Sequence, residues 1–77
     1  MSSQNSAEAL IECVPNISEG RDQQKIDKIV AAATAVPGVR CLDVDPGSDT
    51  NRTVITLVGA PDPISQAAFL LVKKAAE

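Results

Sequence analysis

The chain has 77 residues, and its 7 basic and 10 acidic side chains give a formal net charge of −3. That length corresponds to one small domain or to part of one. An acidic chain is poorly suited to bind nucleic acid or an anionic membrane surface, because neither phosphate nor anionic lipid attracts it. Apolar residues make up 44% of the chain, which predicts a folded core. The longest uninterrupted apolar run, residues 67–72, is much shorter than the about 20 residues of a membrane span.

Histidine is absent and cysteine occurs twice. Without histidine, the chain lacks the usual general base at neutral pH and the commonest metal ligand. Cys13 and Cys41 are two ligands where a structural zinc site needs four, so we predict no metal site. The N-terminal region is polar and carries no export signal. We therefore interpret both cysteines as reduced thiols and predict a cytoplasmic location.

The first half of the chain predicts a tail, a strand and a helix. Residues 1–8 are polar and predict a flexible tail, which leaves residues 9–77 as the folded part. Residues 9–14 are a β-prone run that Pro15 stops, and a loop-forming cluster follows. Residues 22–36 predict a helix, because their apolar residues have the spacing i, i+3, i+4 and i+7 of one helical stripe: Ile26, Ile29, Val30 and Ala33.

Two further strands are predicted as an antiparallel hairpin. Residues 39–45 alternate in polarity, and residues 53–58 are rich in β-branched side chains. Between them, Pro46 begins a segment of turn-forming residues that is longer than a two-residue loop. Strict alternation makes Leu42 and Val44 the core pair of the first of these strands, and it places Asp43 and Asp45 on the opposite face.

A second helix is predicted near the end of the chain. Asp62 is expected to cap it, with Pro63 in its first turn. Its apolar face is expected to contain Ile64, Ala67, Ala68, Leu71, Val72 and Ala75. The order β-α-β-β-α predicts a two-layer α/β (α+β) sandwich with two helices on one face of the sheet.

Polar residues around the hairpin are the candidates for chemistry. Asp43, Asp45 and Asp49 do not have the spacing of a calcium loop, and spacing alone favours a solvated turn. The alternative is that the Asp45 carboxylate orients a base or binds an amine. Asn51 and Arg52 begin a glycosylation pattern, yet they could instead hold a carboxylate, because guanidinium presents a planar fork of donors.

Two blocks of the sequence resemble a known family. Residues 12–20 read Glu-Cys-Val-Pro-Asn-Ile-Ser-Glu-Gly, and residues 42–54 read Leu-Asp-Val-Asp-Pro-Gly-Ser-Asp-Thr-Asn-Arg-Thr-Val. Both blocks, in this order and around a helix, resemble the opening of glutamate formimidoyltransferase, the folate-dependent formiminotransferase of histidine degradation. The resemblance covers nearly the whole chain after the tail, and it corresponds to the first part of the family's N-terminal subdomain.

The resemblance implies an activity and its substrates. The family moves a formimino group from N-formimino-L-glutamate to tetrahydrofolate, with a histidine that carries the proton. That histidine lies in a family segment that would follow Glu77. By position, Asp45 matches the aspartate suggested to assist the histidine. Asn51 and Arg52 match residues expected near the substrate.

We therefore expect an N-terminal fragment of a formimidoyltransferase-like enzyme, inactive by itself, that forms a homo-oligomer or associates with the remainder of the domain. The expected substrates are N-formimino-L-glutamate and folate, and neither nucleic acid nor membrane is an expected partner. One alternative is a small non-catalytic binding or dimerisation module derived from that domain. Another is a structural half-domain that needs a partner chain.

Overall fold

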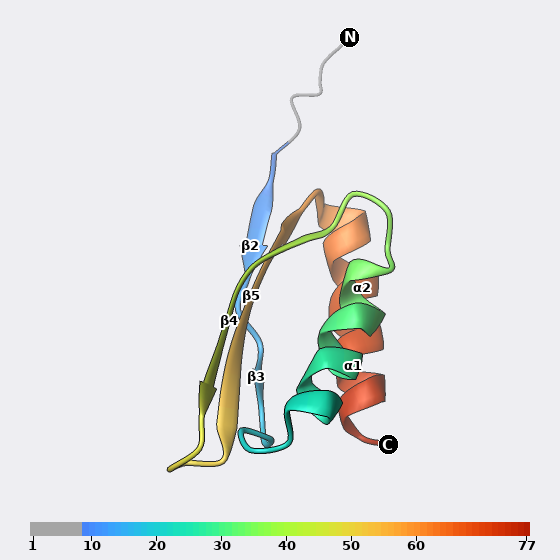
Figure 1. Cartoon of the computed structure of the whole chain (residues 1–77). Coiled ribbons are helices and arrows are strands. Elements are labelled where there is room, and N and C mark those ends of the chain that lie inside the picture. Colours follow the sequence, from blue (N-terminus) through green and yellow to red (C-terminus); the bar gives the residue numbers. More distant parts are fainter. Residues whose placement is uncertain (1–8) are drawn as a thin grey trace, which may run out of the picture.

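The computed structural model describes residues 9–77, so the predicted tail at residues 1–8 lies outside the described residues. The elements follow the order β-α-β-β-α, with the first strand in two pieces. They are β2 (Ile11–Cys13), β3 (Asn16–Ile17), α1 (Gln23–Thr34), β4 (Arg40–Gly47), β5 (Arg52–Gly59) and α2 (Pro61–Ala75). The predicted fold class is confirmed, because both helices lie on the same side of one antiparallel sheet (Figure 1).

Strand β5 is the centre of the sheet. Its Leu57 lies opposite Cys13 of β2 on one side and opposite Cys41 of β4 on the other. Both neighbours run antiparallel to β5, so β2 and β4 are parallel to each other without being adjacent. The predicted hairpin of β4 and β5 is confirmed, and residues 48–51 connect the two strands.

Pro15 interrupts the first strand, which then resumes. The register that pairs Cys13 with Leu57 continues unchanged into the pairing of Asn16 with Val54. Pro15 lacks an N–H group and cannot donate to the ladder, although its carbonyl accepts a 3.0 Å bond from the N–H of Ile55. The prediction that the strand ends at Pro15 with only a loop behind it was therefore wrong, since Asn16 and Ile17 form β3.

A β-bulge in β4 changes which side chains reach the core. The register shifts by one residue between Cys41 and Asp43, so the alternation restarts there. Val39 and Cys41 face the helices before the bulge, and Val44 does so after it. Leu42 is 54% exposed, so its prediction as a core residue was wrong. Asp43 and Asp45 lie on the face away from the helices, as predicted.

The two helices bury one face of the sheet and leave the other uncovered (Figure 1). In α1 the predicted stripe is confirmed, with Ile26, Ile29 and Ala33 buried. In α2, Ile64, Ala67 and Leu71 are buried, but Val72 is 63% exposed, which contradicts its predicted place in the core. The strands contribute Ile17, Ile55 and Leu57, and the segment after α1 contributes Val36 and Val39.

The helix starts differ in how they are capped. Asp22 caps α1 as its side chain accepts a bond from the N–H of Lys25. Helix α2 begins two residues earlier than predicted, because Pro61 occupies its first position and Ala60 is the cap, so Asp62 lies in the first turn instead of capping. Over residues 9–77, no helix is both long and apolar enough to cross a bilayer.

Candidate functional site

The uncovered face of the sheet carries two of the three sequence-predicted site residues, Asp45 and Arg52. We call it the open face. Its members alternate with the buried residues of the same strands. They are Glu12, Val14 and Asn16 from the interrupted first strand, Arg40, Asp43 and Asp45 from β4, and Arg52, Val54, Thr56 and Val58 from β5. Three carboxylates and two guanidinium groups therefore share one surface, which suits it to bind a ligand that carries both charges.

Asp45 and Arg52 are diagonal neighbours on the open face. Asp45 lies opposite Val54, and Arg52 is two residues before Val54 on β5. Such diagonal positions are about 7–8 Å apart, within reach of long side chains. Both residues are exposed, and neither side chain makes a hydrogen bond or ion pair within residues 9–77. The structure thus places an acceptor and a bidentate donor side by side, with no partner among the described residues.

Asn51 has a different position from its neighbour Arg52. It ends the loop between β4 and β5 with a left-handed backbone, φ 51°, which asparagine tolerates better than most residues. Its Oδ1 accepts a 3.0 Å hydrogen bond from the backbone N–H of Gly20. The Asn51 side chain therefore ties the hairpin loop to the loop before α1, and its geometry is that of a positioning residue.

Gly20 allows these two loops to touch. A Cβ at this position would lie 2.5 Å from the carbonyl oxygen of Gly47 and 2.6 Å from the backbone nitrogen of Arg52. Next to it, the hydroxyl of the buried Thr53 donates to the carbonyl of Glu19. These contacts join the two sequence blocks that resemble the formiminotransferase family. The roles of Gly20 and Thr53 were missed from the sequence, where Gly20 gave only a turn signal.

The cysteines belong to the core and not to the open face. Cys13 and Cys41 flank Leu57 on the two sides of β5, both half-buried against the core. Both are free cysteines in the structure. With a whole strand between them, the two residues are too far apart for a disulfide, which needs Cα atoms within about 7 Å.

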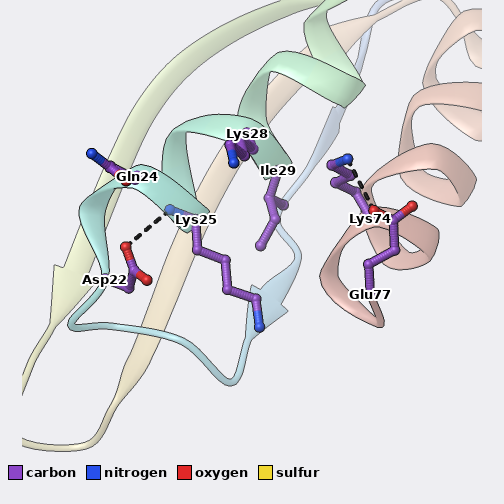
Figure 2. A pocket seen from close by; sticks show the side chains of 7 residues that line it. All are labelled: Asp22, Gln24, Lys25, Lys28, Ile29, Lys74 and Glu77. Carbon is purple, nitrogen blue, oxygen red and sulfur yellow. Dashed lines mark hydrogen bonds and ion pairs between the residues drawn. The ribbon is translucent and has the colours of Figure 1, made fainter.

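A groove of about 340 Å³ lies between α1 and α2, and none of the predicted site residues lines it. Figure 2 shows its lining side chains, which are Asp22, Gln24, Lys25, Lys28, Ile29, Lys74 and Glu77. Asp22 is already engaged in capping α1, and Glu77 forms a 2.9 Å ion pair with Lys74. That bond lowers the pKa of the fully exposed Glu77 carboxyl. The remaining groups form a solvated helix surface.

The part of the chain that the structure describes contains no cluster of metal-ligand side chains. Among residues 9–77 no three His, Cys, Asp or Glu side chains gather as a metal site would require. Asp43 and Asp45 instead occupy successive rows of the open face, opposite Thr56 and Val54.

Comparison with known proteins shows the family. Residues 10–77 match the family model described as the N-terminal subdomain of the formiminotransferase domain. The chain belongs to the formiminotransferase family. It is 56% identical over 66 residues to a formimidoyltransferase-cyclodeaminase of Dictyostelium discoideum. This match covers 86% of this chain and 12% of the relative. It is also 50% identical over 68 residues to a glutamate formimidoyltransferase of Streptococcus pyogenes serotype M1, covering 88% of this chain and 23% of the relative.

The family resemblance noted from the two sequence blocks is therefore confirmed. This member of the formiminotransferase family spans less than a quarter of either of these relatives. Its two blocks meet in space at the end of the hairpin, where the loop at Gly20 contacts the start of β5. The open face extends from that contact across β4 and β5.

Proposed function

We propose that the chain supplies part of the substrate site of a glutamate formimidoyltransferase. The reaction would transfer the formimino group of N-formimino-L-glutamate to tetrahydrofolate, as a step of histidine degradation. The observation that carries the proposal is the adjacent placement of Asp45 and Arg52 on the open face, at the family block that contains both. Both substrates carry glutamate carboxylates, and guanidinium is the side chain that best grips a carboxylate in two places.

Arg52 is proposed to orient the donor. Its position at the start of β5 is held by the contact between Gly20 and the hairpin, so its backbone is fixed before substrate binds. A fixed guanidinium can hold the carboxylate of formiminoglutamate while the amidine carbon is attacked. Such preorganisation lowers the entropic cost of bringing the two substrates together. Asn51 helps to hold the backbone of Arg52 in place, because its side chain accepts a hydrogen bond from the N–H of Gly20.

Asp45 is proposed to act on the proton transfer. The folate nitrogen loses a proton as it attacks, and the glutamate nitrogen gains one as it leaves, so a group must carry the proton between them. This chain has no histidine, and we propose that a histidine outside these 77 residues performs that step. The exposed Asp45 carboxylate can then accept the other N–H of that imidazole and hold its orientation and tautomer.

The test compares two aspartates on the same face. In a complete protein that carries this segment, Asp45→Asn should lower kcat by about 10²–10⁴-fold, because an amide cannot stabilise the imidazolium. Asp43→Asn is the matched control, because Asp43 lies on the same face two residues before Asp45. This variant should keep kcat within about threefold of the original value. Equal losses from both substitutions, or none from either, would remove Asp45 from the proposed role.

We also propose that residues 9–77 are an incomplete subdomain, and that the chain alone does not transfer formimino groups. A formimino-transfer assay of the purified 77-residue chain should then show no turnover above the buffer rate. Robust turnover would contradict the proposal that a histidine outside these residues is needed, and it would show that the site is complete without further residues. A cytoplasmic location belongs to the same proposal, because the free thiols of Cys13 and Cys41 suit a reducing compartment.

A further inference from the structure

Three consecutive residues of the loop before α1 each bond to the hairpin of β4 and β5, and the loop lies beside the end of that hairpin (Figure 1). We call these three hydrogen bonds the loop clamp. They run from the Thr53 hydroxyl to the Glu19 carbonyl, from the Gly20 N–H to Oδ1 of Asn51, and from Nε of Arg21 to the Ser48 carbonyl. Arg52 lies between two of the bonded hairpin residues. The loop clamp therefore fixes the backbone where β5 begins.

The side chain of Glu19 shapes the loop that makes these bonds. One carboxylate oxygen, Oε2, accepts from the backbone N–H of Arg21 at 3.2 Å and from the backbone N–H of Asp22 at 3.0 Å. The side chain thus folds back over its own loop and closes residues 19–22 into a turn. Bonds from N–H groups to a carboxylate are charge-assisted, which makes them stronger than bonds between neutral groups.

This turn directs all three loop groups of the clamp toward the hairpin. The carbonyl belongs to Glu19 itself, the N–H of Gly20 lies within the turn, and the Arg21 side chain leaves from a residue whose N–H the carboxylate holds. Gly20 is buried, with backbone atoms of Arg52 beside it, so the loop fits the hairpin closely. Other backbone angles over residues 19–22 would direct these three groups elsewhere.

We propose that Glu19 is a positioning residue for Arg52. The inference rests on the proposed function and deepens it, because it names the side chain that sets the place of the guanidinium. The Glu19 carboxylate holds the turn, the turn holds the start of β5, and Arg52 is in place before formiminoglutamate binds. The buried core lies elsewhere, so loss of the carboxylate should change the placement of Arg52 more than the stability of the whole fold.

The neighbouring Asp22 provides a matched comparison. Its carboxylate accepts from the N–H of Lys25 and caps α1, as Figure 2 shows, so its bond lies within the helix and not in the loop clamp. Removing a helix cap lowers stability without moving the hairpin. Glu19 and Asp22 are therefore two carboxylates of one short segment that separate a positioning effect from a merely structural one.

The first test measures whether Glu19 holds the loop clamp, by hydrogen exchange in a complete protein that carries this segment. Glu19→Ala should speed exchange of the Gly20 amide by about tenfold or more, because its bond to Asn51 then opens more often. Glu19→Gln should stay within about threefold of the original protein, since one amide oxygen of the same reach can accept both N–H groups. Asp22→Ala should lower the melting temperature and leave this amide within about threefold. Unchanged exchange in Glu19→Ala overturns the proposal.

The second test measures whether the loop clamp acts through Arg52, by steady-state kinetics of the same proteins. Glu19→Ala should raise KM for formiminoglutamate about threefold to tenfold, with kcat within about threefold. Glu19→Gln and Asp22→Ala should keep KM within about twofold. In a protein that already carries Arg52→Lys, adding Glu19→Ala should change KM by less than about twofold, because two residues that act as one unit are not additive.

The outcomes separate this inference from the proposed function. If Arg52→Lys raises KM and Glu19→Ala does not, the positioning role is wrong and the proposed function stands. If Arg52→Lys leaves KM unchanged, the proposed function fails and the positioning role fails with it. An equal rise of KM from Glu19→Ala with and without Arg52→Lys also overturns the inference, as does a Glu19→Gln variant as impaired as Glu19→Ala. An equal rise from Asp22→Ala would trace the effect to general destabilisation and overturn it too.

Discussion

The backbone N–H of Gly20 donates a 3.0 Å hydrogen bond to Oδ1 of Asn51, 31 residues further along the chain. The bond joins the loop before α1 to the end of the hairpin. It is accompanied by the bond from the Thr53 hydroxyl to the carbonyl of Glu19, and by a 3.0 Å bond from Nε of Arg21 to the carbonyl of Ser48. Arg52, between Asn51 and Thr53, is thereby placed on the open face by contacts on both sides of it.

We predict that Gly20→Ala strongly destabilises the fold. Its added Cβ would meet backbone atoms of Gly47 and Arg52 at 2.5–2.6 Å, and backbone cannot move aside as a flexible side chain can. Overpacking of this kind costs about 1–3 kcal/mol, a large share of the free energy of unfolding of so small a domain. Urea unfolding measures the loss. Ser18→Ala, at an exposed position of the same loop, is the control and should stay within about 0.5 kcal/mol.

At Asn51 we predict a ranked series of three substitutions. Asn51→Asp keeps an acceptor for Gly20 and tolerates the left-handed backbone, so it should cost least. Asn51→Gly keeps the backbone but loses the acceptor, which costs about 1 kcal/mol. Asn51→Ala loses both and should cost about 2–3 kcal/mol. Equal unfolding free energies for the aspartate and alanine variants would show that the Asn51 side chain does not hold the loops together.

For Arg52 we predict an effect on substrate binding. In a complete protein, Arg52→Lys should raise KM for formiminoglutamate about tenfold and change kcat little, since lysine cannot form the planar bidentate pair with a carboxylate. Arg40→Lys is the matched control, because Arg40 lies on the same face opposite Val58, several rows away. Steady-state kinetics separates the two constants. An unchanged KM in Arg52→Lys would leave Arg52 as a solvated surface residue.

The bulge in β4 predicts opposite outcomes for two neighbouring apolar residues. Leu42→Ser should change the unfolding free energy by less than about 0.5 kcal/mol, because Leu42 is 54% exposed. Val44→Ser should cost about 1–3 kcal/mol, because Val44 packs against the core opposite Ile55. Thermal melts of the two variants make the comparison. A larger loss at Leu42 would mean that β4 keeps strict alternation and has no bulge.

Much of the fold is determined locally by the sequence. The apolar stripe of Ile26, Ile29 and Ala33 specifies α1 and the face that it buries, because helical periodicity is a property of residues three and four apart. The β-branched run of residues 53–58 likewise predicts strand β5, although both of its faces carry apolar residues and only the structure shows that Thr53, Ile55 and Leu57 are buried. Each of these patterns is complete within about a dozen residues, so it could be recognised without knowing what lies across from it.

Only the tertiary structure decided the register and the contacts between distant loops. The bulge at Leu42 depends on how β4 meets β5, and the return of the strand after Pro15 depends on the ladder to Ile55. The bond between Gly20 and Asn51 requires two loops that are far apart in the chain. These features arise where one segment must fit against the backbone of another. The side-chain pattern of a single segment does not determine that fit, so it could not be predicted from the sequence.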